Sequence, residues 1–333
     1  MTLQTNHKQM IRIATPSRIH ITLIDLNGSL GRVDGGIGIA LNHPSIVISA
    51  EKADEVTVEG KSALSERIRK GAELISKNHG GVHIKIEKDI PPHIGLGSGT
   101  QAYLAGGMAA NVLYGLGLSV REIAKMVQRG GTSGIGVTAF ERGGFILDGG
   151  HRFDEKGFMP SSASHALPPP VLLHHDFPDW SIMLVIPHIK GESGTFKGAS
   201  GIREVNIFKE ECPIPLIEVQ ALSHIILMEL LPALIEKDLQ VFGSSINRIQ
   251  KIGFKQREVD LQPQAREIME VLLQSGAAGA GMSSFGPLIY GITDSPSEVK
   301  KAVKEQLGER IKILTTQARN NGASIRFISP QSN

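Results

Sequence analysis

The sequence predicts an α+β protein of two halves. Segments in which apolar and polar residues alternate, as in half-buried strands, are interspersed with segments whose apolar residues have helical spacing. The two kinds do not alternate regularly, so a doubly wound parallel sheet is not favoured. The Pro- and Ser-rich stretch 159–170 is the best candidate for a linker. We therefore expect one domain over residues 1–170 and a second over 171–333, a size that suits this length.

The elements of the first half are bounded by glycine-rich turns. Strands are predicted for residues 10–26, 38–50, 54–60, 81–90 and 145–151, and helices for 63–78 and from 120 onward. Residues 27–38 and the stretch that follows the second helix are rich in glycine and are expected to be turns. The run 90–120 is nearly free of charge, but its glycines lower its hydrophobicity. It is expected to be a helix packed inside a domain rather than a membrane span.

The second half is expected to begin with a strand and to be mainly helical after it. Helices are predicted for 215–250, with a break or kink at Pro232, and for 265–277 and 297–311; strands are predicted for 180–187, for the end of 277–293 and for 323–329. The apolar helices of this half would suit a homodimer. The domain division and the homodimer are both expectations from pattern alone.

Composition excludes several functional classes. Lys and Arg number 35 and Asp and Glu 33, so the net charge of +2 is far from the basic footprint of a nucleic-acid-binding protein. One cysteine allows neither an internal disulfide nor a Cys-rich metal site. The first residues lack the apolar core of a signal peptide, which favours the cytoplasm. We expect small-molecule substrates and no nucleic-acid or membrane partner.

The stretch PPHIGLGSGTQ, residues 91–101, carries the strongest local signal. Its glycines allow backbone N–H groups to approach a ligand, and a helix that starts just after them would direct its positive end to the same point. Ser98 and Thr100 add hydroxyl groups. The stretch fits a phosphate-binding loop and equally fits a capped helix start in a Gly-rich chain. Its spacing matches neither the dinucleotide fingerprint nor the Walker loop.

Three motifs in order resemble the GHMP kinase superfamily. PPHIGLGSGTQ resembles its phosphate loop, TPSRIHITLIDL (15–26) its N-terminal motif, and GAAGAGMSSFGPLIYGI (276–292) its C-terminal glycine motif. The resemblance implies a ribosomal protein S5 domain 2-like first half and a ferredoxin-like α/β second half. It also implies that phosphate or pyrophosphate is bound by residues of two loops: Gly95, Leu96, Gly97, Ser98, Gly99, Thr100, Gly279, Gly281, Ser283 and Ser284.

Within that superfamily, the chain most resembles the β-ribofuranosylaminobenzene 5′-phosphate synthases. The similarity is carried by LIDLNGSLGRVDGGIGIAL, RGGTSGIGVTAFERGGFILDGGH and GAGMSSFGP. It implies a decarboxylating ribosyltransferase of methanopterin biosynthesis, which condenses phosphoribosyl pyrophosphate with para-hydroxybenzoate or para-aminobenzoate. An ATP-dependent small-molecule kinase is the alternative. Kinases of the superfamily often carry a catalytic Asp where this chain has Gly136, which favours the transferase.

The turn DLNGSLGR supplies the candidate catalytic pair. Asp25 and Arg32 stand at its two ends, so the turn can bring a carboxylate and a guanidinium to one site. With the resemblance, Asp25 is expected to act as a base or to stabilise the ribosyl cation. Arg32 is expected to hold a carboxylate or phosphate. Without the resemblance, a turn cap and a surface ion pair explain the same residues.

Four further residues are possible substrate contacts. Arg18 and His20 alternate on a strand and share a face, although a structural histidine is equally consistent. Thr132 and Ser133 lie in the second glycine-rich turn, where they can donate to a ligand or end a helix. Mg²⁺ is expected to accompany the charged diphosphate substrate. No metal site formed by protein side chains alone is predicted.

Overall fold

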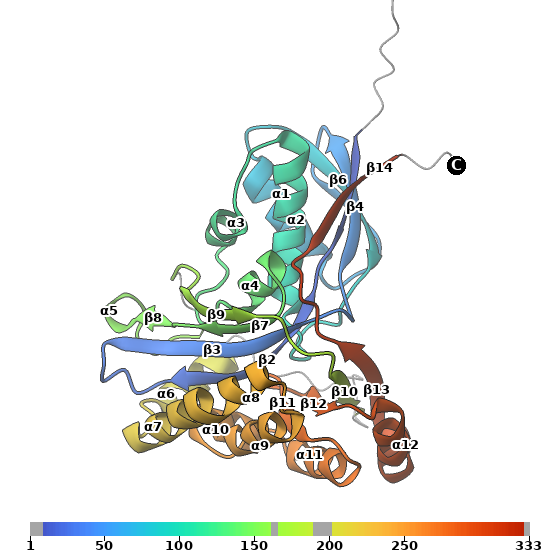
Figure 1. The fold of residues 1–333 in the computed structure, drawn as a ribbon. Helices are drawn as coiled ribbons and strands as arrows, with labels where there is room; N and C mark the ends of the chain where they lie inside the picture. Colours follow the sequence, from blue (N-terminus) through green and yellow to red (C-terminus); the bar gives the residue numbers. More distant parts are fainter. Residues whose placement is uncertain (1–8, 161–165, 189–201, 330–333) are drawn as a thin grey trace, which may run out of the picture.

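The computed structural model of the chain describes residues 9–160, 166–188 and 202–329 (Figure 1). The predicted α+β class is confirmed, since the described residues form three mainly antiparallel sheets covered by helices. Part of the predicted linker, residues 161–165, lies outside the described residues.

The first sheet carries the helix that follows the phosphate loop. Its strands, in spatial order, are β14 (Ser324–Ile328), β1 (Met10–Ala14), β4 (Val47–Ala53), β6 (Gly81–Lys88) and β5 (Thr57–Glu59). Helices α1 (Ser65–Ser76) and α2 (Ser98–Tyr114) pack together beside this sheet (Figure 1). Their backbones approach closely, because a Cβ on Gly106 would lie only 2.0 Å from the carbonyl oxygen of Ile68. The small residues of α2 thus serve a tight helix pair.

The second sheet crosses the middle of the molecule (Figure 1). Its strands are β2 (Ser17–Asp25), β3 (Arg32–Leu41), β7 (Phe145–Asp148) and β9 (Val171–His175), with β8 (His151–Arg152) paired to the far end of β3. Helix α4 (Ile135–Glu141) packs on β2, β3 and β7, whereas α7 (Leu216–Ile225) and α10 (Gly253–Asp260) contact β2. Helices from both halves of the chain therefore meet at β2.

The third sheet belongs to the second half. Its order is β11 (Gly279–Met282), β12 (Ile289–Thr293), β10 (Ser181–Pro187) and β13 (Ile311–Gln317). Helices α9 (Leu239–Ile249), α11 (Ala265–Gln274) and α12 (Pro296–Leu307) pack against it. The remaining helices are α3 (Val120–Met126), α5 (Phe153–Lys156), α6 (Ile202–Glu211) and α8 (Leu231–Glu236), with a π-helical turn, Ile226–Leu230, before α8 and a 3₁₀ turn, Gly308–Arg310, before β13.

Three sequence predictions in the first half were wrong in detail. The expected strand 38–50 covers the end of β3 and the start of β4, which belong to different sheets. The expected strand 10–26 is two strands, β1 and β2, which separate at Thr15–Pro16 and enter different sheets. The expected turn 27–38 ends at Arg32, where β3 begins. Glycines of β3 are needed for packing: a Cβ on Gly38 would lie 2.3 Å from Ile135 Cγ2. Composition indicated a turn, whereas tertiary packing makes these glycines part of a buried strand.

Two strands that come after the domain boundary predicted near residue 170 pair with strands that come before it. Strand β9 pairs with β7, and β14, near the end of the chain, pairs with β1. Both therefore extend sheets of the first half. The elements that were not predicted include α4, α5, α6, α10, β9, β11 and β13.

One helical run resembles a membrane span in composition. Leu216–Glu236, which joins α7, the π turn and α8, is long and apolar enough to cross a membrane, and a third of its most apolar window is buried. A single such helix is weak evidence, since core helices of soluble proteins have the same composition. The predicted helical region 215–250 is confirmed, but the predicted break at Pro232 is wrong: Pro232 lies in the first turn of α8 within the continuous run, and the break comes at Lys237, whose backbone is left-handed.

Candidate active site

The predicted phosphate loop ends in the first turn of α2. Gly95 and Gly97 have φ angles of 96° and 72°, which glycine adopts without strain. Helix α2 starts at Ser98, and its first N–H groups have no acceptor within the helix. These N–H groups and the positive helix end make this turn suited to an anion.

The three motifs meet at the carbonyl oxygen of Gly95. Arg18 Nη1 donates to it over 2.6 Å, and Ser283 Oγ donates to it over 2.7 Å. Ser283 Oγ also accepts from the backbone N–H of His20, and the N–H of Ser284 donates to the carbonyl of His20, both over 3.0 Å. The structure thus brings Arg18, His20 and both serines to the loop. The Ser283 hydroxyl is already engaged within the protein, so its contribution is to join the motifs.

A buried ion pair missed by sequence reasoning supports this junction from α10. Lys255 Nζ pairs with Glu258 and donates to the carbonyls of Met282 (3.3 Å) and Ser284 (3.2 Å). Burial lowers the pKa of Lys255, and the charge of Glu258 counteracts that shift. Burial likewise lowers the pKa of Arg18 to about 10, again opposed by Glu258. Arg18 remains cationic at neutral pH, and both Arg18 and Lys255 act on carbonyl groups.

His20 lies in the same cluster as a neutral side chain. It is 5% exposed, and neither ring nitrogen has a hydrogen-bond partner among the described residues. Burial, and then the charges of Arg18 and Lys255, keep its pKa well below 6.5. A neutral imidazole can contact a substrate but supplies no charge to bind an anion.

Gly279 and Gly281 of the third motif are required by packing. A Cβ on Gly279 would lie 2.6 Å from the Cα of Gly243 in α9, and one on Gly281 would lie 2.5 Å from Tyr290 Oη. Both residues are buried in β11. Their missing side chains make room for the protein itself, so a role in binding phosphate stays a prediction.

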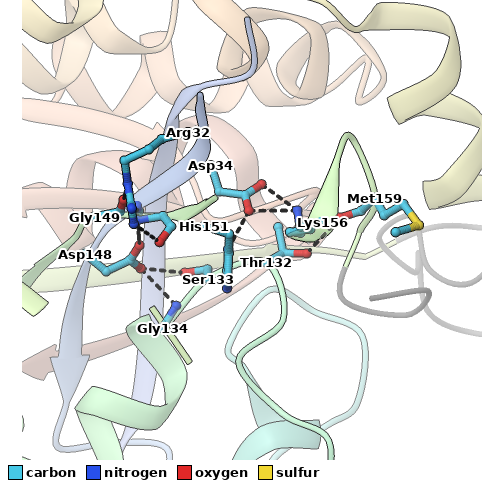
Figure 2. A network of polar contacts seen from close by, with 12 residues as sticks. Arg32, Asp34, Thr132, Ser133, Gly134, Asp148, Gly149, His151, Lys156 and Met159 are labelled. Carbon is cyan, nitrogen blue, oxygen red and sulfur yellow. Dashed lines mark hydrogen bonds and ion pairs between the residues drawn. The ribbon is translucent and has the colours of Figure 1, made fainter. Parts of the chain in front are cut away.

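Asp25 and Arg32 lie at the opposite end of β2. Asp25 Oδ1 accepts from the N–H groups of Asn27 (2.7 Å) and Gly28 (3.0 Å), which caps the turn. Arg32 donates from Nε to the carbonyl of Gly149 and from Nη2 to that of Gly150 (Figure 2). These bonds occupy one edge of the guanidinium, and no described residue accepts from Nη1. Arg32 is exposed, so that edge can meet a ligand.

Asp148, which the sequence analysis missed, joins strand β3 to two glycine-rich turns. Its carboxylate accepts from the N–H groups of Gly36, Gly134 and Gly150 over 2.9–3.0 Å, and Ser133 Oγ lies 3.5 Å away (Figure 2). Burial raises the pKa of Asp148 to about 6, although the backbone donors act in the opposite direction. The second glycine-rich turn is thereby fixed to β3.

A second buried carboxylate completes this end of the site. Asp34 receives Lys156 Nζ at 2.7 Å and His151 Nδ1 at 2.7 Å (Figure 2). Thr132 Oγ1 donates to the carbonyl of Met159 nearby (3.3 Å). Asp34 and Asp148 could have been found from one signal, since each begins an Asp-Gly-Gly sequence; Lys255 has no such signal.

The candidate site therefore has two parts. Arg18, at the phosphate loop, and Asp25 are seven residues apart on β2, which at about 3.3 Å per residue puts their Cα atoms roughly 20 Å apart. The start of α4 bridges the interval: Thr100 of α2 lies against Gly136, and Gly134 bonds Asp148. Within the described residues, no cluster of three or more His, Cys, Asp or Glu side chains could hold a metal ion.

Comparison with known proteins identifies the family. Residues 64–144 match the GHMP kinases N terminal domain and residues 230–309 the GHMP kinases C terminal domain. The beta-ribofuranosylphenol 5′-phosphate synthase of Methanothermobacter thermautotrophicus is 47% identical over 93% of this chain and 97% of its own length. The synthase of Archaeoglobus fulgidus is 46% identical over 95% and 99%. The chain belongs to the beta-ribofuranosylphenol 5′-phosphate synthase family.

The solved structures show that the whole chain adopts the fold of these kinases. Mevalonate kinase of L. major, in complex with R-mevalonate, superimposes with a TM-score of 0.67 at 18% identity, covering 97% of this chain and all of that one. At this identity the likeness concerns the fold alone. The predicted two-part GHMP-kinase-like architecture is thus confirmed, whereas the roles of individual site residues stay predictions.

The raised pKa of Asp148 predicts a pH-dependent stability. Because the folded protein holds this proton more tightly than the unfolded chain, the free energy of unfolding should fall as pH rises from about 4 to about 6. A shift of this size corresponds to about 3 kcal/mol. Asp148→Asn cannot titrate, so its stability should change less with pH over that window. Urea unfolding of both proteins at several pH values measures the difference, and parallel pH profiles would contradict the assignment.

Proposed function

We infer that the chain is a decarboxylating ribosyltransferase that condenses phosphoribosyl pyrophosphate with para-hydroxybenzoate or para-aminobenzoate. The products are a C-riboside 5′-phosphate, CO₂ and pyrophosphate, in tetrahydromethanopterin biosynthesis. The near full-length identity with synthases of that name carries this conclusion. The phosphate loop at the start of α2 supplies the anion site that the reaction needs.

The kinase alternative rests only on the distant superfamily relation. Gly136, at the position where many of these kinases are expected to have a catalytic Asp, packs against α2. A Cβ there would lie 3.3–3.7 Å from atoms of Thr100, and the Gly136 carbonyl accepts from the buried amide of Gln101. A larger acidic side chain would crowd Thr100. This packing favours glycosyl transfer over phosphoryl transfer.

The reaction breaks two bonds and makes one. The bond from the anomeric carbon to the diphosphate oxygen breaks, and the diphosphate leaves with its electron pair. The ring carbon that bears the carboxylate then bonds to the anomeric carbon. When CO₂ leaves, the electrons of its bond return to the ring and restore aromaticity. A base that takes the proton of the para hydroxyl group makes the ring carbon more nucleophilic, and returns that proton at the end.

Of the two roles expected for Asp25, the two-part site favours the base over the residue that stabilises the ribosyl cation. A cation stabiliser must adjoin the anomeric carbon and hence the departing diphosphate, whereas Asp25 is at the other end of β2. The base meets the para hydroxyl group, on the side of the aromatic ring opposite the carbon that attacks. The ring and the anomeric carbon therefore lie between the base and the diphosphate. Arg32, near the same turn, presents its free edge to an oxygen anion of the substrates.

Mg²⁺ is proposed to enter as the complex of phosphoribosyl pyrophosphate. Mg²⁺ commonly keeps several waters and binds through substrate phosphates with few protein ligands. The described residues fit that mode, since they hold no cluster of three acidic or His side chains.

We also propose a cytoplasmic homodimer. Large apolar side chains are exposed at Ile217 (71%), Met228 (67%) and Ile235 (55%). All three lie along the run Leu216–Glu236, and together we call them the apolar stripe. Covering this stripe with a second copy would explain its composition. The cytoplasmic location is proposed from the sequence, because the single cysteine and the first residues fit a reducing compartment.

The catalytic proposal is tested by product formation. The protein with Mg²⁺, phosphoribosyl pyrophosphate and para-hydroxybenzoate should release CO₂ and pyrophosphate in equal amounts. The same assay with para-aminobenzoate shows which acceptor is used. ATP consumption with an alcohol substrate, without CO₂ release, would contradict the proposal and support a kinase.

Asp25→Asn separates a catalytic from a structural role. The Asn side chain keeps an oxygen acceptor for the N–H groups of Asn27 and Gly28, so the turn should survive. Loss of the base should lower kcat by about 10²–10⁴ with little change in melting temperature. Equal loss of stability and activity, or retained kcat, would show that Asp25 only caps the turn.

Met228→Glu tests the homodimer. A charge at the centre of the apolar stripe should convert a dimer into a monomer, as measured by light scattering. Leu172→Glu is the control, because Leu172 is 65% exposed on β9, away from the stripe. A wild-type monomer at micromolar concentration, or a dimeric Met228→Glu variant, contradicts the proposal.

A further inference from the structure

Two arginines from distant segments converge on the first turn of α2. Arg67 lies in α1 and Arg129 follows α3. A Cβ on Gly99, the second residue of α2, would lie 3.2 Å from Arg67 Nη1 and 3.9 Å from Arg129 Nη2. Both guanidinium groups therefore flank the turn whose N–H groups have no partner within the helix. Arg67 lies in none of the sequence motifs, and Arg129 is the first residue of the stretch RGGTSGIG, where the sequence analysis assigned it no role.

Both side chains are held in place by neighbouring rings. The Arg129 guanidinium carbon lies 4.5 Å from the ring centroid of Tyr103, one helical turn beyond Gly99. Arg67 Nη2 lies 3.3 Å from His93 Nε2, in the phosphate-loop motif. A guanidinium stacked on an aromatic ring is kept in one orientation. The pair is therefore pre-positioned beside α2.

No direct ion pair joins either arginine to a carboxylate in the described part of the chain. None of the ion pairs there includes Arg67 or Arg129. Arg129 Nε is buried without a hydrogen-bond partner. Burial lowers the pKa of Arg129, Tyr103 and Glu204 raise it, and the charge of Arg67 lowers it. Two neighbouring cations with a buried free N–H group form an arrangement that an anion would stabilise.

Arg18 differs from this pair in its function. Its guanidinium donates to the carbonyl of Gly95 and lies beneath the loop against Gly97. It is partly buried, and its charge is offset by Glu258. Among the arginines near the loop, Arg67 and Arg129 are the two that face the start of the helix.

We propose that Arg67 and Arg129, together with the first turn of α2, bind the diphosphate group of phosphoribosyl pyrophosphate. This inference rests on the proposed function. A diphosphate has two phosphoryl groups, so one can accept from the backbone N–H groups while the other accepts from the guanidinium forks. The same contacts strengthen as the leaving diphosphate gains charge. The arginines are thus substrate-binding residues that also stabilise the leaving group.

Calorimetric binding of Mg²⁺-pyrophosphate tests the assignment without turnover. Arg67→Gln and Arg129→Gln should each weaken pyrophosphate binding by about tenfold or more, because each removes charge-assisted hydrogen bonds. Arg69→Gln is the matched control: Arg69 lies on the same helix but pairs with Glu66 and Glu73, so binding should not change. Arg129→Lys, which keeps the charge but loses the fork, should give an intermediate affinity.

Ribose 5-phosphate, titrated in parallel, distinguishes the two ends of the substrate. Its affinity should be the same in wild type and variants. Unchanged pyrophosphate affinity in folded Arg67→Gln and Arg129→Gln proteins would overturn the proposal, as would a loss confined to ribose 5-phosphate. Melting temperature verifies folding, and the lysine variant serves if a glutamine variant does not fold. If wild type releases no CO₂ but the pyrophosphate result holds, the proposed function fails while the diphosphate site stands.

Discussion

The carbonyl oxygen of Gly95 is where three distant segments of the chain are fixed to one another. It accepts from Arg18 of β2 and from Ser283, which follows β11. A loop in this position needs the left-handed backbone at Gly95 and Gly97, and its shape determines where α2 begins. The direction of the α2 N–H groups, and hence the anion site, depends on this junction.

Buried charge maintains the junction at an energetic cost. Lys255 and Glu258 lie out of solvent and Arg18 is partly buried beside them, and unpaired ions are strongly disfavoured in such surroundings. Their mutual attraction and the carbonyl acceptors offset desolvation. Removing Glu258 alone would leave two cations facing each other. The cluster thus couples α10, in the second half, to the loop of the first half, which explains why neither half carries the site alone.

The sequence predicted what depends on local pattern and missed what depends on contacts between distant segments. The amphipathic helix α1 and the helix after the phosphate loop were predicted correctly, since their signals are periodicity and glycine placement. The first part of strand β3 was taken for a turn, because the need for Gly36 beside Ser133 exists only in the folded protein. Lys255, Arg67 and Arg129 were missed for the same reason. Each becomes significant only through a partner far away in sequence.

The central claim is that α2 receives the diphosphate while Asp25 acts across the aromatic ring. A crystal structure of the protein with Mg²⁺-phosphoribosyl pyrophosphate and an unreactive para-hydroxybenzoate analogue tests it most directly. The account predicts the diphosphate at the N–H groups of Ser98–Thr100 and the analogue's para substituent within hydrogen-bond distance of Asp25. A diphosphate bound elsewhere, with the first turn of α2 unoccupied, would contradict it.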